Sequence, residues 1–135
     1  MLQNKKMFTF GKNQRLCSKK KIETLFRQGK SFLVFPISVR CITEPGEGNI
    51  RTLIVCPKRY QRKAVCRNRI KRLIRENYRL NSTNLKRIAK ENSVNIDFSM
   101  SYVHKQTVDY SVIQKTVTEI LSKLELTVSS LQKQL

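Results

Sequence analysis

The sequence predicts an α+β fold, in which helices cover one face of a small mixed β-sheet and leave the other face open. Apolar residues recur at helical spacing in three segments of the chain. Residues 32–43 and 50–56 are rich in Val, Ile and Phe, and residues 94–102 alternate between apolar and polar side chains. The length of 135 residues fits a single domain. The predicted order is therefore α-β-β-α-β-α, with room for an extra short strand inside residues 32–43.

The first predicted helix begins after Ser18, whose side chain can accept a hydrogen bond from the first turn. Its apolar face consists of Ile22, Leu25 and Phe26. Gly29 is expected to end the helix as a C′ glycine. Residues 1–30 hold nine Lys or Arg and one Glu, so this end of the chain is strongly basic. Residues 1–14 are predicted to form an irregular basic arm.

Residues 32–43 are predicted to form a strand, the first part of which is an edge or a bulge because Pro36 cannot donate a backbone hydrogen bond. Residues 44–49 contain proline, two glycines and asparagine, a composition that favours a turn. Residues 50–56 read as the next strand. We therefore expect these two strands to pair with each other as a hairpin.

The most unusual stretch is residues 58–79, which carry ten Lys or Arg and one Glu. One helical face of this stretch is apolar and consists of Cys66, Ile70, Leu73 and Ile74. The opposite side carries Lys71, Arg72, Arg75 and Arg79. Arg67 and Arg69 lie at the two rims of the apolar face. Solvated helices normally interleave acids that relieve repulsion between cations, and here only Glu76 is available. A polyanion is therefore the expected partner, and nucleic acid is the expected polyanion.

The C-terminal part contains a short predicted helix at residues 85–91, a strand at residues 94–102 and a final helix. The apolar face of the strand consists of Val94, Ile96, Phe98, Met100 and Tyr102. Asp109 or Ser111 is expected to cap the final helix. The buried face of that helix is predicted to be Ile113, Val117, Ile120, Leu121 and Leu124. The tail at residues 125–135 is expected to be frayed.

Several functional classes find no support in the sequence. No apolar run is long enough to span a membrane, and residues 1–10 lack the apolar core of a secretory signal, so a cytoplasmic protein is expected. The four cysteines lack the paired spacing of a zinc site and are expected to be small buried residues. The acids do not pair on one face, and the single histidine, His104, has no obvious partner. No catalytic or metal-binding residue is therefore expected in the protein itself.

Residues 64–76 read Ala-Val-Cys-Arg-Asn-Arg-Ile-Lys-Arg-Leu-Ile-Arg-Glu. This stretch resembles the signature of the bacterial ribonuclease P protein family, in which an Arg-Asn-Arg motif is followed by a basic amphipathic helix. The resemblance implies one domain over residues 15–124, flanked by the arm at residues 1–14 and the tail at residues 125–135. It also implies a left-handed β-α-β crossover through the central helix, as in the second domain of ribosomal protein S5. By base rate alone such a crossover would be right-handed.

The resemblance further implies the function of the protein subunit of ribonuclease P, an endoribonuclease that removes the 5′ leader of precursor tRNA. In that enzyme the RNA subunit performs the hydrolysis and binds most of the Mg²⁺, and no organic cofactor takes part. The expected partners are the catalytic ribonuclease P RNA and precursor tRNA. No obligate protein partner and no membrane are expected.

The positions that the family uses for RNA binding fall on the central helix and on the basic pair before it. They are Lys58, Arg59, Arg67, Asn68, Arg69, Lys71, Arg72 and Arg75. A second set is implied to bind the single-stranded leader and consists of Arg15, Phe26 and Arg40. Arg40 stands where the family tends to have an aromatic residue, so its role depends on the strand register near Pro36. The alternative for Phe26 is packing in the core.

Other classes of function share part of this pattern. A ribosomal or general RNA-binding protein would have the same charge and fold class without a role in tRNA 5′ processing. A DNA-binding helix-turn-helix protein fits less well, because the basic helix lies between strands rather than after a second helix. An all-protein nuclease fits least, because it would need carboxylates that the sequence does not group.

Overall fold

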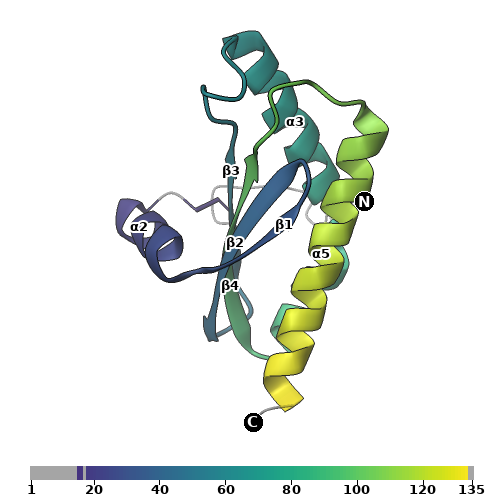
Figure 1. Ribbon diagram of the computed structural model, residues 1–135. Helices are drawn as coiled ribbons and strands as arrows, with labels where there is room; N and C mark the ends of the chain where they lie inside the picture. Colours follow the sequence, from purple (N-terminus) through teal and green to yellow (C-terminus); the bar gives the residue numbers. More distant parts are fainter. Residues whose placement is uncertain (1–14, 17, 134–135) are drawn as a thin grey trace, which may run out of the picture.

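The computed structural model describes residues 15, 16 and 18–133, so the predicted arm at residues 1–14 lies outside the described residues. The elements follow in the order shown in Figure 1: α2 (Lys19–Gln28), β1 (Lys30–Val34), β2 (Ile37–Pro45), β3 (Ile50–Val55), α3 (Ala64–Asn81), α4 (Thr83–Glu91), β4 (Val94–Tyr102) and α5 (Tyr110–Lys133). The predicted α+β class is confirmed, and the extra short strand is present as β1.

The strands form one mixed sheet in the order β1-β2-β4-β3. Strand β4 pairs antiparallel with β2 and parallel with β3, so it separates the two strands that we expect from the sequence to form a hairpin. That expectation is wrong. The link between β2 and β3 is instead fastened to the start of β4, where the Asn95 side-chain oxygen accepts hydrogen bonds from the backbone N–H groups of Gly48 (3.0 Å) and Asn49 (2.8 Å). Gly48 has a φ of 89°, a conformation that favours glycine.

The true hairpin lies earlier in the chain, between β1 and β2. Its turn contains Phe35 and Pro36, which are joined by a cis peptide bond. Proline has no backbone N–H, so the apolar run at residues 32–43 is divided between two strands at this point. The resulting register places Arg40 opposite Ser99 of β4. Arg40 therefore lies on the polar side of β4, where the resemblance requires it to lie.

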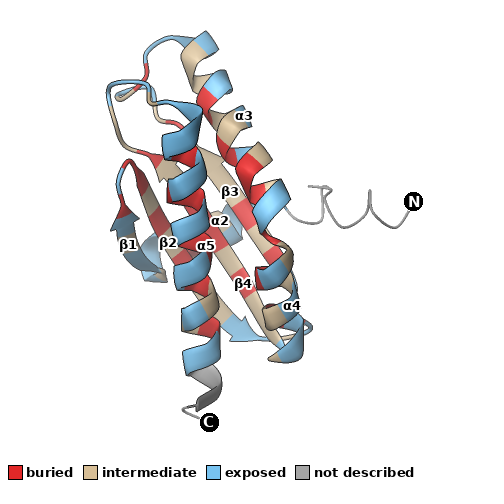
Figure 2. Ribbon diagram, turned by 90° about the vertical axis from the view of Figure 1, so that its right-hand side faces the viewer, coloured by how far each residue is buried: buried red, intermediate tan, exposed pale blue. Residues whose placement is uncertain are grey.

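One face of the sheet, here called the inner face, packs against α3, α4 and α5 (Figure 2). Nearly all the predicted core positions of β4 and α5 are buried on this side, namely Ile96, Phe98, Met100, Tyr102, Ile113, Val117, Ile120, Leu121 and Leu124. Val94 is partly buried. Tyr78 of α3 packs against Phe98, with ring centroids 5.7 Å apart. Burial of this apolar surface is the main source of stability for the fold.

Helix α2 lies against the opposite face, here called the outer face, so the expectation that this face is left open is wrong in part (Figure 1). Its residue Leu25 is completely buried, because an amphipathic helix needs a surface on which to place its apolar side. The Ser18 side chain accepts a hydrogen bond from the Lys21 N–H (3.4 Å), which confirms the predicted cap. Gly29 ends the helix, but in an extended conformation rather than as a left-handed C′ residue. A Cβ at Gly29 would lie 2.4 Å from the Leu25 carbonyl oxygen, so close approach requires glycine here.

Helix α5 continues to Lys133, past the point where fraying is expected. Val128 is 1% exposed and extends the buried stripe of Leu121 and Leu124 by another turn, so the prediction of a frayed tail is wrong for this part of the helix. Among the described residues, no helix combines the length and the apolar character needed to cross a membrane. The left-handed sense of the crossover from β3 through α3 to β4 stays a prediction.

Candidate RNA-binding surface

Helix α3 has a buried side and a cationic side. Its buried residues are Ile70, Ile74, Asn77 and Tyr78. Of the predicted RNA-binding residues on this helix, four are exposed, namely Asn68, Arg69, Arg72 and Arg75. Lys71 is half-buried between the two sides, and the predicted core residues Cys66 and Leu73 are only partly buried. The buried side of α3 also includes the polar residue Asn77, whose side-chain amide donates a hydrogen bond to the Leu73 carbonyl oxygen (2.9 Å). The pattern of apolar residues in the sequence therefore does not identify the whole buried side.

Arg67 lies on the buried side of α3, apart from the other cations. At about 100° per residue, it is within about 20° of Ile74 around the helix axis. Its guanidinium donates hydrogen bonds to the backbone carbonyl oxygens of Gln61 (3.1 Å) and Arg62 (2.7 Å). Arg67 thus holds the segment before the helix in place, while Arg69 of the same Arg-Asn-Arg motif is exposed.

The single acid of α3, Glu76, does not neutralise the exposed cations. It forms an ion pair with Arg79, and the hydrogen bond from Arg79 lowers the pKa of Glu76. Residues 67–75 contain no acid. Among the described residues, no ion pair joins a cation of this segment to an acid. An external anion, such as the phosphates of a nucleic acid, would relieve the repulsion among these cations.

Lys58 and Arg59 are exposed in the segment between β3 and α3. This segment forms one wall of a cavity of about 760 Å³, here called the basic pocket, which is lined by residues 59–63, Cys66 and residues 105–107. The lining includes Arg59, Arg62, Lys63 and Lys105 but no acid. Lys63 is also the N-cap of α3, where it makes no side-chain capping hydrogen bond. The helix dipole adds to the positive potential at this end, so the basic pocket attracts anions.

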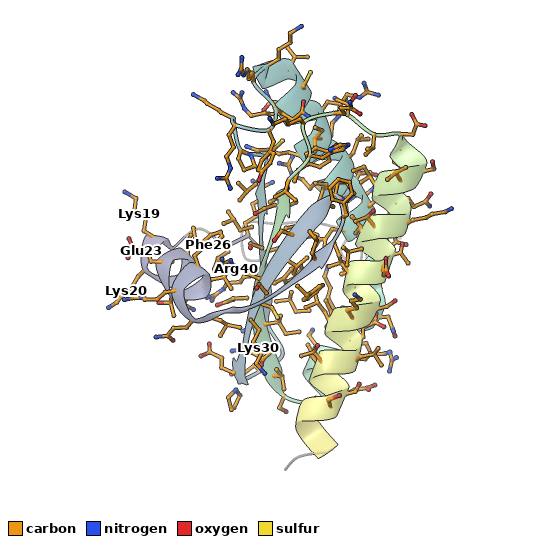
Figure 3. The ribbon with its side chains drawn as sticks, viewed as in Figure 1. Lys19, Lys20, Glu23, Phe26, Lys30 and Arg40 are labelled. Carbon is orange, nitrogen blue, oxygen red and sulfur yellow. The ribbon has the colours of Figure 1, made fainter. Side chains whose placement is uncertain are left out.

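The predicted leader-binding residues lie on the outer face or at its edge. The Arg40 guanidinium is 5.6 Å from the centroid of the Phe26 ring and donates a hydrogen bond to the Phe26 carbonyl oxygen (Figure 3). Phe26 is 39% exposed, so it is not a core residue. Arg15 is exposed and pairs through its backbone with Thr52, on the far edge of the sheet. The structure therefore brings Phe26 and Arg40 together and places Arg15 apart from them.

Further charged residues lie on α2 and on the strands next to this pair. Lys19, Lys20 and Glu23 project from α2 on the side away from the sheet (Figure 3). Lys30, at the start of β1, pairs in register with Cys41 and therefore lies on the inner face. Sequence reasoning missed one acid on the same face as Arg40, namely Asp97 of β4, which pairs in register with Arg51 of β3. Burial raises the pKa of the Asp97 carboxyl, although Lys21 and Arg51 act in the opposite direction. The alternation of β4 assigns Asp97 to the polar face, but the sequence carries no signal that the residue is half-buried.

The basic pocket is the second feature that sequence reasoning missed. Its two walls come from residues 59–63 and 105–107, which are far apart in the chain. The first wall belongs to the recognised basic stretch, whereas Lys105 stands alone in its part of the sequence. No local pattern therefore indicates that the two segments meet.

Two of the three described cysteines are small buried side chains. Cys41 and Cys56 are buried, and burial raises the pKa of both thiols. Cys66 is half-buried, and Cys17 lies outside the described residues. Within the part of the chain that the structure describes, no three His, Cys, Asp or Glu side chains gather closely enough to hold a metal ion.

The chain is similar to one kind of protein in both sequence and structure. The profile of the Ribonuclease P family matches residues 10–125. Two sequences named "Ribonuclease P protein component", from two strains of Porphyromonas gingivalis, are 32% identical over 120 residues, covering 86% of this chain and 88% of each relative.

Solved structures of the same kind share the fold. The ribonuclease P protein of Thermotoga maritima superposes with a TM-score of 0.63 at 23% identity, covering 81% of this chain and 96% of that protein. That of Staphylococcus aureus superposes with a TM-score of 0.60 at 22% identity, covering 83% and 95%. At these identities the structural similarity confirms the arrangement of helices and strands. The assignment to a family depends on the sequence matches.

Proposed function

Because this chain belongs to the ribonuclease P protein family, we propose that it binds precursor tRNA beside its partner, the ribonuclease P RNA, and assists removal of the 5′ leader. As a protein component of ribonuclease P, it is part of an endoribonuclease that matures tRNA 5′ ends. In this proposal the RNA subunit performs the hydrolysis in the cytoplasm and holds the Mg²⁺ that the reaction needs. The protein contributes binding and electrostatics.

The observation that carries the proposal is the cationic side of α3, where Arg69, Arg72 and Arg75 are exposed and form no ion pair with an acid of the described chain. The catalytic RNA and its substrate are both polyanions and repel each other. Lys and Arg side chains that contact phosphates release condensed counterions, which favours binding. A protein that contributes such contacts lowers the amount of Mg²⁺ needed to bring the two RNAs together.

We propose that the outer face binds the single-stranded leader. A base stacked on an aromatic ring contributes about 1–3 kcal/mol, largely independent of sequence. Phe26 offers an exposed ring, and Arg40 holds a guanidinium beside it that can contact a phosphate or stack on a base. Arg51 on the same face and Arg15 at its edge are further cations along the sheet.

The first test is cleavage of precursor tRNA by a bacterial ribonuclease P RNA at low Mg²⁺, with and without this protein. We expect the protein to accelerate cleavage. The combined variant Arg69→Ala, Arg72→Ala and Arg75→Ala should lose most of that acceleration while keeping its melting temperature. Cleavage that is indifferent to the protein would contradict the proposal.

The second test separates leader binding from general RNA binding. In complex with the ribonuclease P RNA, the protein should bind precursor tRNA more tightly than leaderless tRNA, and Phe26→Ala should narrow this preference. Leu126→Ala is the matched control, because Leu126 is an exposed apolar residue of α5, on the other side of the sheet. Equal affinity for both substrates, unchanged by Phe26→Ala, would leave only a basic RNA-binding domain.

A further inference from the structure

A second exposed aromatic residue lies outside the predicted leader-binding set. Phe35, in the turn between β1 and β2, is 59% exposed, which exceeds the 39% exposure of Phe26. Its ring centroid is 4.9 Å from that of His104, and the two ring planes are inclined by 60°. The turn, the segment after β4 and the start of α3 lie at the same end of the molecule, the upper end in Figure 1.

This aromatic pair is held in place by contacts from three parts of the chain. The Val103 N–H donates a hydrogen bond to the Pro36 carbonyl oxygen (2.9 Å), which ties the segment after β4 to the turn that carries Phe35. The Gln61 side-chain amide donates a hydrogen bond to the His104 carbonyl oxygen (3.0 Å), which ties the same segment to the start of α3. The backbone that carries the two rings is therefore fixed before any ligand binds, which reduces the entropy lost on binding.

The backbone of His104 adjoins the basic pocket. Gln61, which contacts the backbone of His104, lines that pocket, and so does Lys105, the residue after His104. The pocket contributes Arg59, Arg62, Lys63 and Lys105 without an acid. Phe35 is exposed and His104 is half-buried, so Phe35 is the ring that is open to a ligand. An exposed ring near a cationic groove is a combination that proteins use to bind single-stranded nucleic acid, because bases stack on rings while cations follow phosphates. An apolar protein partner would not explain the cations.

We propose that Phe35 and His104, together with the basic pocket, form a second binding site for single-stranded RNA. One unpaired base stacks on the exposed side of Phe35, and the phosphates next to it lie in the basic pocket. The inference rests on the proposed function only in that the ligand is RNA. It assigns to this end of the molecule a base-stacking role that is separate from the Phe26–Arg40 pair.

Titration of the protein with two oligomers tests the stacking directly. The first is a short oligoadenylate, and the second is an abasic oligomer with the same number of phosphates and no bases. Phe35→Ala should weaken oligoadenylate binding by about 5- to 150-fold, the contribution of one stacked base, and should leave abasic binding unchanged. Phe35→Tyr should restore the oligoadenylate affinity because it restores a ring. The double variant Arg62→Gln and Lys105→Gln should weaken the binding of both oligomers to the same extent.

The same titrations in a Phe26→Ala protein separate the two sites. If the effect of Phe35→Ala persists there, the second site acts independently of the leader-binding pair. If Phe26→Ala alone affects oligoadenylate binding, the second site is disproved and the proposed function stands. An equal loss for both oligomers on Phe35→Ala would also disprove it, because the loss would not depend on bases.

The unpaired nucleotide can come from either RNA of the complex, and two further titrations distinguish them. If Phe35→Ala weakens assembly with the ribonuclease P RNA alone, the nucleotide belongs to that RNA. If assembly is unchanged but the complex binds precursor tRNA more weakly, the nucleotide belongs to the substrate. No loss in either titration would disprove a role of this site in ribonuclease P.

Discussion

The inner and outer faces of the sheet are made from the same strands, yet they carry different kinds of residue. In β4, Phe98 and Ser99 are neighbours and both are almost inaccessible, at 0% and 1% exposed. Phe98 packs among the helices of the inner face, whereas Ser99 lies opposite Arg40 on the outer face. Alternation along a strand thus allows one segment to stabilise the fold with half of its residues and to support a polar surface with the other half.

Helix α3 repeats this division around a helix axis. Ile70 and Ile74 pack in the core, whereas Arg72 and Arg75 are exposed. In both elements, substitutions on the buried side should change the free energy of unfolding, and substitutions on the exposed or polar side should change RNA affinity. Each of the following predictions tests that separation.

The largest expected effect concerns salt. If about 6–10 phosphates are contacted, RNA affinity should fall by about 10³- to 10⁵-fold between about 50 and 200 mM salt, because counterion release becomes less favourable. The apolar contacts of the inner face should make the melting temperature far less sensitive to the same change. Filter binding and thermal unfolding in matched buffers measure the two quantities. A flat binding curve would remove the electrostatic role of the exposed cations.

The next effect compares the neighbours in β4. Phe98→Ala should lower the free energy of unfolding by about 3–5 kcal/mol, because it leaves a cavity in the core. Ser99→Ala should change it little, because the buried Ser99 hydroxyl oxygen has no hydrogen-bond partner in the part of the chain that the structure describes. Urea denaturation of both variants measures the difference. Similar losses for the two would mean that the faces are not distinct.

Helix α3 provides the corresponding pair. Ile74→Ala should lower the free energy of unfolding by about 2–5 kcal/mol, whereas Arg72→Ala should stay within about 0.5 kcal/mol of the unmodified protein. RNA affinity should respond in the reverse order once the Ile74 variant is measured under conditions in which it is folded. If Arg72→Ala melts early, its side chain has a structural role that the division does not allow.

The smallest effect concerns Asp97, an acid on the outer face. Burial raises the pKa of its carboxyl, so the folded protein binds a proton at Asp97 more tightly than the unfolded chain does. Protonation of Asp97 therefore stabilises the fold. This stabilisation is fully present below the usual aspartate pKa and is lost as pH rises through the raised pKa. Asp97→Asn should raise the melting temperature near neutral pH, and the difference should vanish at low pH. A difference that is constant with pH would assign the effect to something other than ionisation.

The features that sequence predicted well depend on residues close together in the chain. The alternation of β4 located its buried face, and the spacing of Ile70 and Ile74 located most of the buried side of α3. Phe26 and Arg40 were grouped, together with Arg15, through a resemblance rather than through local spacing, and the contact between them was not predicted.

The features that sequence missed depend on contacts between distant segments. Strand pairing is set by the whole sheet, so the insertion of β4 between β2 and β3 has no local signature. The inward turn of Arg67 depends on the carbonyl oxygens of Gln61 and Arg62, which come within reach of its guanidinium only once the preceding segment has folded. Phe35 is exposed because it lies in the turn between β1 and β2. The residues on both sides of Pro36 are apolar, so the sequence does not indicate that a turn lies there.

The place of β4 in the sheet also has a consequence for how the chain folds during synthesis. The β1–β2 hairpin and β3 leave the ribosome before β4, yet both β2 and β3 need β4 as their neighbour. The contact order is therefore higher than in a sheet built from successive hairpins, which slows folding. A nascent chain that ends before residue 94 exposes two strand edges with unpaired backbone groups, and such edges promote aggregation. The basic helix is synthesised before the sheet that supports it is complete, so its charges also keep the unfinished chain soluble.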